Sequence, residues 1–164
     1  MADSMSNLAE AFAGESQANR RYLAYAQKAE DEGYPLVARR FRVAAASETV
    51  HAINHLKTMG EVKSTGENLQ GSIGGENYEH VTMYPGFIEI AKSEGDEDAR
   101  FSFHAANEAE KFHEKMFAEA FADLTKIPDK TFYVCQVCGM TYEDGVPDEC
   151  VVCSSPKSRI IEVG

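Results

Sequence analysis

The first 134 residues contain no cysteine, and no apolar run reaches the roughly 18 residues of a membrane-spanning helix. The N-terminus lacks the basic stretch and apolar run of a secretory signal, so we expect a cytoplasmic protein. Basic residues are scarce: 16 Lys and Arg stand against 27 Asp and Glu, giving a net charge of -11. This balance argues against nucleic-acid binding, because phosphate contacts need clustered cations.

Apolar residues recur at helical spacing in four segments of the chain. The expected helices run from Ser6 to Gly33, from Pro35 to Gly60, from near Thr65 to Gly95 and from Asp96 to Leu124. Ser64 and Glu67 have capping-box spacing, which sets the start of the third helix. Pro85 should kink that helix or force a local irregularity, since proline has no backbone N–H. We therefore predict a mainly α fold, with one domain over residues 1–128 and a small module over residues 133–164.

Each helical stripe carries a glutamate at a position where an apolar residue is expected. These acids are Glu15, Glu48, Glu76 and Glu110. A buried carboxylate is costly unless a cation compensates its charge, and no Lys or Arg stripe faces these positions. A metal cluster is the simplest source of the missing positive charge.

Two of these glutamates begin a Glu-x-x-His pair, whose members share one helical face. One such pair is a weak signal. A single Glu on two helices together with Glu-x-x-His on two others is the donor pattern of di-iron carboxylate bundles. Carboxylates with few imidazoles suit iron or manganese better than zinc or copper. The predicted ligands are Glu15, Glu48, His51, Glu76, Glu79, Glu110 and His113, with His55, His80 and His104 outside the site.

Two tyrosines, Tyr22 and Tyr84, lie near the predicted site in helical spacing. They are either core aromatics or phenols that hydrogen-bond the ligand carboxylates. The residue pattern alone favours neither interpretation.

All four cysteines lie in the C-terminal module, as Cys135-x-x-Cys138 and Cys150-x-x-Cys153. This spacing in a chain expected to be cytoplasmic favours thiolates on a metal over disulfides. Tetrahedral four-thiolate coordination fits zinc or one iron, so spacing alone leaves a structural zinc ribbon open. The carboxylate site favours iron, because a one-electron centre can supply a redox cluster. Such a short module needs its metal to fold.

Taken together, these motifs make the chain resemble the rubrerythrin family over nearly its whole length. The resemblance rests on AFAGESQANRRY, SETVHAINH, GGENYEHVTMYPGF, NEAEKFHEKMF and CQVCGMTYEDGVPDECVVC. It implies a ferritin-like four-helix bundle with a non-haem di-iron site, followed by a rubredoxin-like module with one iron on four cysteines. It also implies that Glu79 and His51 exchange as ligands of one iron with oxidation state. Tyr22 and Tyr84 would support the ligands from just outside the metal's own contacts.

The connection between the second and third helices is short, at about five residues that reach at most ~18 Å. A ferritin-like crossover must return along a bundle roughly 30 Å long. We therefore expect a homodimer that exchanges helices between chains. Glycines at Gly71, Gly74 and Gly75 leave one alternative, in which the crossover extends to about twelve residues.

The expected function is a peroxidase that reduces hydrogen peroxide to water in oxidative-stress defence. The four-cysteine iron would relay electrons from an external rubredoxin or NAD(P)H-dependent reductase, because no nucleotide-binding glycine motif is present. Two alternatives stay open. One is a ferroxidase or iron-handling protein that uses oxygen and needs a cage assembly. The other is a non-enzymatic electron carrier or a zinc-stabilised binding module.

Overall fold

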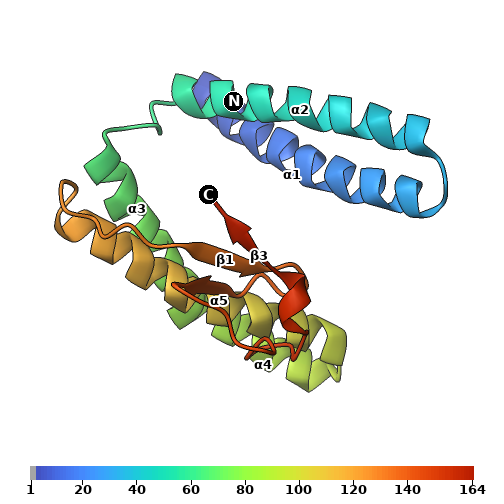
Figure 1. Cartoon of the computed structure of the whole chain (residues 1–164). Helices are drawn as coiled ribbons and strands as arrows, with labels where there is room; N and C mark the ends of the chain where they lie inside the picture. The colour runs from blue at the N-terminus through green and yellow to red at the C-terminus, as the bar shows by residue number, and fades with distance from the viewer. Residues whose placement is uncertain (1–2) are drawn as a thin grey trace. The chain divides into compact units, whose positions relative to one another are not determined.

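The computed structural model describes residues 3–164 (Figure 1). The chain divides into two compact units, and the division falls between Lys63 and Ser64. Each unit is therefore described by itself.

The first unit is a pair of helices, α1 (Ser4–Asp31) and α2 (Pro35–Thr58), which lie side by side (Figure 1). Their shared core is built on the small residues Ala26, Ala29 and Ala38, which let the two backbones approach closely. Asn19 is buried between the helices, and its amide donates to the carbonyl of Ala45 at 2.7 Å.

The second unit begins with α3 (Thr65–Tyr78), a π-helical segment (Glu79–Met83) and α4 (Tyr84–Glu94), which pack against α5 (Glu97–Ala122). The predicted capping box is confirmed, because the Ser64 and Glu67 side chains cap each other's backbone N–H groups. The predicted irregularity is also confirmed. Pro85, which has no N–H to donate, lies in the first turn of α4, and only Tyr84 separates it from the end of the π-helical segment.

The rest of the second unit is a three-stranded antiparallel sheet of β1 (Phe132–Cys135), β2 (Thr141–Glu143) and β3 (Ile160–Val163), in the order β2-β1-β3. A short 3-10 helix, Lys157–Arg159, leads into β3. The sheet carries its own small core, centred on Cys135, Cys150 and Ile160.

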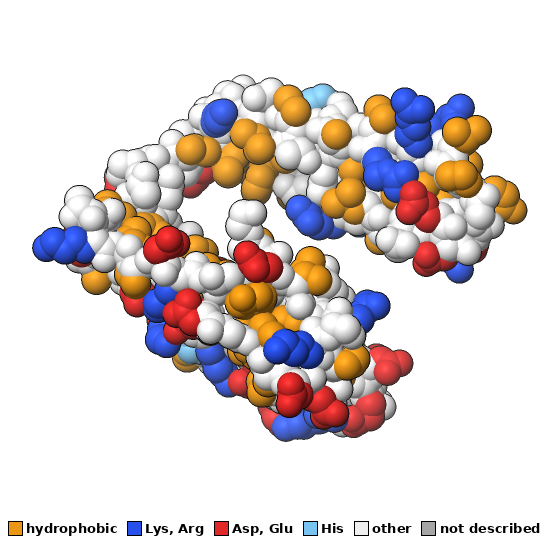
Figure 2. All heavy atoms as spheres, in the orientation of Figure 1, with side chains coloured by type: hydrophobic (Ala, Val, Ile, Leu, Met, Phe, Trp, Pro, Cys, Tyr) orange, Lys and Arg blue, Asp and Glu red, His pale blue; other side chains and the backbone are white. Residues whose placement is uncertain are grey.

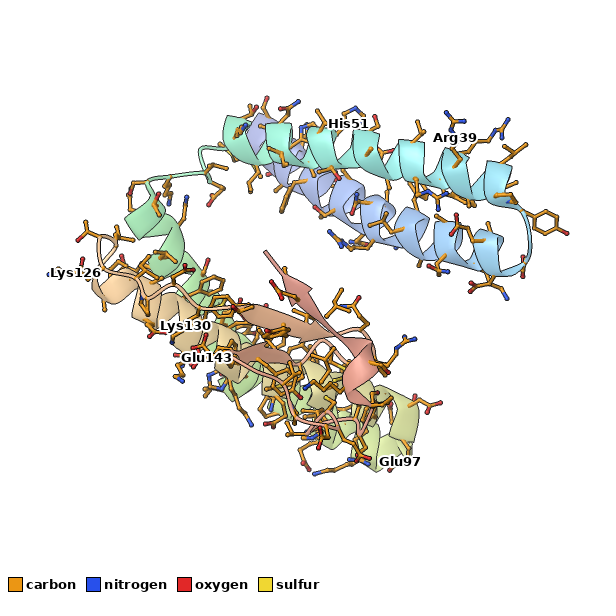
Figure 3. The ribbon with its side chains drawn as sticks, viewed as in Figure 1. Arg39, His51, Glu97, Lys126, Lys130 and Glu143 are labelled. Carbon is orange, nitrogen blue, oxygen red and sulfur yellow. The ribbon has the colours of Figure 1, made fainter. Side chains whose placement is uncertain are left out.

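The sheet module contacts α5 through β2, and ion pairs tie the two together. Lys130, in the segment before β1, places its Nζ 2.7 Å from Glu119 of α5 and 3.0 Å from Glu143 of β2 (Figure 3). Lys115 of α5 adds a longer contact to Glu143, at 3.4 Å. Only 16% of the Lys130 side chain is exposed, so this ion-pair cluster is more sheltered than a typical surface pair.

The predicted fold class is confirmed: the chain is mainly helical and ends in a small sheet that gathers four cysteines. The helices begin and end within two residues of their predicted bounds, and Gly60 and Gly95 take the left-handed conformation where the second and third predicted helices stop. Among residues 3–164, no helix is long and apolar enough to cross a membrane. The division into domains 1–128 and 133–164 stays a prediction.

Candidate metal centres

The first unit brings together Glu15 of α1 with Glu48 and His51 of α2, and one donor atom of each lies within 4.8 Å of the others. His51 Nδ1 lies 2.8 Å from Glu48 Oε2 and 3.8 Å from Glu15 Oε1. The three residues form one cluster of hard donors, here called the α1–α2 half-site. Figure 3 shows His51 on α2.

The second unit repeats this arrangement with Glu76 of α3 and Glu110 and His113 of α5, again within 4.8 Å. His113 Nδ1 lies 2.6 Å from Glu110 Oε2 and 3.8 Å from Glu76 Oε2. This cluster is called the α3–α5 half-site. In each half-site, Nδ1 of the histidine faces both carboxylates, with nearly equal distances in the two units.

The ligand side chains are less buried within their own units than the core-register argument implied. Exposed fractions are 31% for Glu15, 18% for Glu48, 21% for Glu76 and 15% for Glu110. Within residues 3–164, none of these four carboxylates pairs with a Lys or Arg. Their charge is therefore left to a cation or a proton, as the sequence argument required.

Glu79, the seventh predicted helical ligand, lies at the first position of the π-helical segment. It is not among the three residues of the compact cluster, but it is within electrostatic reach of it. Burial and the charge of Glu110 raise the pKa of Glu79, and the charge of His113 lowers it in part. Burial, a hydrogen bond with Glu110 and the charges of Glu110 and Glu79 raise the pKa of Glu76 to about 7. The α3–α5 half-site is thus crowded with negative charge.

The two tyrosines differ in their surroundings. Tyr22 stacks on Phe41 with ring centroids 6.1 Å apart, and within residues 3–63 it forms no hydrogen bond to a predicted ligand carboxylate. Its supporting role stays a prediction. Burial and the charges of the half-site carboxylates, that of Glu110 foremost, raise the pKa of Tyr84. Its phenol therefore keeps its proton and lies close enough to the acids to feel their field.

The donor chemistry of both half-sites fits iron. Each offers two carboxylates and one imidazole, a set that suits hard first-row ions. Neither contains a sulfur donor. An added divalent cation would neutralise the acidic cluster that otherwise raises the Glu76 pKa.

The four cysteines form the second candidate centre, with all four sulfur atoms within 4.8 Å of one another and none in a disulfide. The Cys135–Cys153 and Cys138–Cys150 sulfur pairs are 3.7 and 3.5 Å apart. A tetrahedral four-thiolate site with metal–sulfur bonds of about 2.3 Å has sulfur atoms about 3.8 Å apart. The cluster therefore has the dimensions of a single-ion site.

Hydroxyl and backbone groups surround these sulfurs. The Tyr142 phenol donates to Cys150 Sγ at 3.1 Å and accepts from the Val151 N–H at 3.2 Å. Burial by itself raises the pKa of Cys150, but hydrogen bonds from Tyr142 and from backbone N–H groups outweigh it and lower that pKa to about 6. Burial raises the pKa of Cys138, and the neighbouring thiols add to the rise. The module thus favours a thiolate at one sulfur even before a metal binds.

The sequence interpretation missed two contacts beside the α3–α5 half-site. His80, expected to be a surface or packed histidine, places Nε2 2.5 Å from Glu114 of α5, which also accepts from Asn77. Thr141 of β2 lies 3.0 Å from Nε2 of His113. Neither contact has a sequence signal, because both depend on how separate elements pack.

The Glu-x-x-His pairs and the Cys-x-x-Cys pairs have the local arrangement that their spacing predicts. The Glu48–His51 and Glu110–His113 pairs share helical faces, and the two Cys-x-x-Cys pairs converge on one point. His55 and His104 lie outside both half-sites. The assignment of these residues as metal ligands stays a prediction that their geometry supports.

Comparison with known proteins gives a consistent result. The family model described as Rubrerythrin matches residues 6–121. Rubrerythrin-2 of Clostridium acetobutylicum is 36% identical, with 93% of this chain and 92% of the relative covered. Nigerythrin of Nitratidesulfovibrio vulgaris is 32% identical, with 93% and 83% covered. A solved structure of nigerythrin in its fully reduced, all-ferrous state is similar at 30% identity and a TM-score of 0.57, with 99% of this chain and 88% of that chain covered.

Proposed function

Since the chain belongs to the rubrerythrin family, with its di-iron and rubredoxin-like iron sites, we propose that it reduces hydrogen peroxide to water in oxidative-stress defence. One observation carries the proposal. The chain holds two matched carboxylate–histidine half-sites and a separate four-thiolate site, so hard and soft redox ligands occur together. A cytoplasmic location stays a prediction.

Two ferrous ions held by the half-sites would supply the two electrons and the Lewis acidity that break the O–O bond of peroxide. The chain's own residues have simpler tasks. The carboxylates hold the ions and balance their charge, and the histidines present Nδ1 to the same space. Tyr84 keeps its phenolic proton, so it is a hydrogen-bond donor at the edge of the α3–α5 half-site.

We further propose that the two half-sites combine between two copies of the chain. Each unit leaves an apolar groove beside its ligand stripe. The groove on the first unit has a volume of about 390 Å³ and is lined by Tyr22, Val37, Phe41 and others. The groove on the second unit, of about 210 Å³, is lined by Phe87, Ile90 and Phe103 among others. Figure 2 shows hydrophobic side chains at the surface of both units, as expected of faces that pack against a partner.

The length of the connection favours exchange between chains. Six residues separate Thr58 at the end of α2 from Thr65 at the start of α3, and they reach at most about 21 Å. The 24-residue helix α2 is about 36 Å long, which a ferritin-like crossover must span. The three glycines of the alternative with a longer crossover, Gly71, Gly74 and Gly75, lie inside α3. In the proposed homodimer, α1 and α2 of one protomer pack on α3–α5 of its partner.

The cysteine module would relay electrons from an external rubredoxin or NAD(P)H-dependent reductase. Cys150→Ser tests this role, because it removes one thiolate and leaves the helical ligands intact. We expect the variant to lose donor-driven peroxide turnover and to keep a single stoichiometric oxidation of its reduced helical site. Full steady-state turnover by the variant would contradict the relay.

The matched control is Ser155→Ala, which removes a hydroxyl 3.0 Å from Cys153 Sγ without removing a thiolate. It should keep donor-driven turnover. Product analysis should show two electrons consumed for each peroxide in wild type and control. A ratio that differs from two would argue against reduction to water.

A further inference from the structure

The two half-sites match in their carboxylate contacts but differ at the second nitrogen of the histidine. Among residues 3–63, Nε2 of His51 meets only the hydroxyl of Ser47, 3.5 Å away on its own helix, and the His51 side chain is 49% exposed. Nε2 of His113 meets the hydroxyl of Thr141 at 3.0 Å, and the His113 side chain is 28% exposed. Thr141 itself is only 5% exposed. The α3–α5 half-site is therefore tied to the cysteine module of its own unit.

Strand alternation explains why Thr141 reaches the helix. Successive side chains of a strand point to opposite faces, so Thr141 and Glu143 share one face of β2 and Tyr142 takes the other. Glu143 meets Lys130 and Lys115 on the α5 side, whereas Tyr142 donates to Cys150. Two adjacent residues, Thr141 and Tyr142, thus connect the α3–α5 half-site with the four cysteines.

The hydrogen-bond direction at Thr141 follows from its other contact. Its hydroxyl donates toward the carbonyl of Gly139 at 3.4 Å, so its oxygen is free to accept from Nε2–H of His113. Nδ1 of His113 lies 2.6 Å from Glu110 Oε2, a distance that needs a proton between the two atoms. When a cation takes the place of that proton, the neutral ring carries its proton on Nε2, for which the Thr141 oxygen is the acceptor. Histidine ligands usually have their other ring nitrogen fixed in this way by a neighbouring acceptor.

We propose that Thr141 is a positioning residue for His113, and that it seats the cysteine module on the α3–α5 half-site of its own chain. The inference rests on the proposed metal site but not on the peroxide reaction. It makes the two half-sites unequal in what their own units supply: Thr141 fixes His113 beside the cysteine module, whereas His51 has only the long contact with Ser47 among residues 3–63. In each relay step one electron would pass from the four-cysteine iron to the ion held by His113. The donor iron would change from ferrous to ferric and the acceptor from ferric to ferrous, with no atom transferred.

The test compares Thr141→Val, Thr141→Ser and wild type in the full-length protein with zinc already bound to the four cysteines. Ferrous ion is titrated anaerobically and its affinity for the helical site is measured by calorimetry. Loss of an outer hydrogen bond to a ligand histidine typically weakens metal binding about 10–100-fold. We expect a loss of that size for Thr141→Val and near-complete recovery for Thr141→Ser, which restores the hydroxyl.

The matched control is Ser47→Ala, which removes the corresponding hydroxyl from His51. Because that contact is long and exposed, we expect its effect to be below about threefold. Equal losses for the Ser47 and Thr141 variants would overturn the proposed inequality. Wild-type affinity in Thr141→Val would overturn the positioning role.

A second readout separates positioning from general destabilisation. Nitrogen-15 NMR of the protein with zinc bound at the four cysteines and at the helical site should show a hydrogen-bonded, slowly exchanging Nε2–H of His113 in wild type and Thr141→Ser, and a rapidly exchanging Nε2–H in Thr141→Val. Equally slow Nε2–H exchange in Thr141→Val would contradict the assigned hydrogen bond. Neither measurement uses peroxide, so the inference and the proposed function can fail independently.

Discussion

Two variants that each lack a working metal site should restore one another when they pair. The first variant carries Glu48→Ala and His51→Ala, which disable the α1–α2 half-site. The second carries Glu76→Ala and Glu110→Ala, which disable the α3–α5 half-site. Neither variant alone can build a complete site, whether its helices are exchanged or not.

The expected magnitude follows from the proposed topology. In an exchanged heterodimer, one site combines the two intact halves and the other combines the two damaged halves. The purified heterodimer should therefore hold about half the wild-type number of helical iron sites. If each bundle is built from a single chain, every site in the same mixture has one damaged half, and the expected number is zero.

The assay uses two different affinity tags on co-expressed variants, so that tandem purification isolates heterodimers alone. Iron at the helical site and peroxide turnover per dimer are then compared with wild type carrying the same tags. If the heterodimer contains no more helical iron and shows no more peroxide turnover than the single variants, helix exchange is refuted. Failure to recover any tandem-tagged species would refute the dimer itself.

Three further predictions concern single side chains. Tyr142→Phe removes the hydrogen bond to Cys150 and should lower the reduction potential of the four-cysteine iron by about 20–60 mV, measured by spectroelectrochemistry, because that bond stabilises the electron-rich reduced state. The pKa of Glu76 is raised to about 7, so ionisation of Glu76 destabilises the metal-free fold. We expect the free energy of unfolding of wild type, relative to Glu76→Gln, to be greatest at low pH and to fall as pH rises from 4.5 to 7. Urea denaturation measures this difference. A stability difference that rises over this range would contradict the assigned shift. Lys130→Met should increase amide hydrogen exchange where β2 contacts α5, because it removes the ion-pair cluster. Lys126→Met is the control and should leave this exchange unchanged, since the Lys126 side chain is 82% exposed. Equal exchange in both variants would show that the ion-pair cluster does not hold the module.

The clustering of the predicted ligand residues could be anticipated because their spacing leaves a local pattern in the sequence. Glu48 with His51 and Glu110 with His113 break the apolar stripe at a fixed spacing, and the helix fixes which side chains share a face. The four cysteines follow the same logic, since each pair brackets a tight turn. The capping box at Ser64 also acts within one turn of helix.

Features that depend on packing between elements were not predictable. The sequence predicted an irregularity from Pro85 but not its form. The irregularity is a π-helical segment that begins at Glu79 and packs against α5. The contact of Thr141 with His113 requires the module to lie on that helix in one register, and no periodicity encodes it. The partial exposure of the predicted ligand side chains was also not predicted. The sequence argument assumed that all four helices cover these side chains, whereas the exposed fractions describe each unit by itself.

The most direct test of the account is anaerobic mixing of fully reduced protein with hydrogen peroxide and, separately, with oxygen, followed by stopped-flow absorbance of the helical iron. The account predicts oxidation by peroxide that is much faster than oxidation by oxygen, with one peroxide consumed for each pair of helical iron ions. Faster oxidation by oxygen would contradict peroxide reduction and favour a ferroxidase.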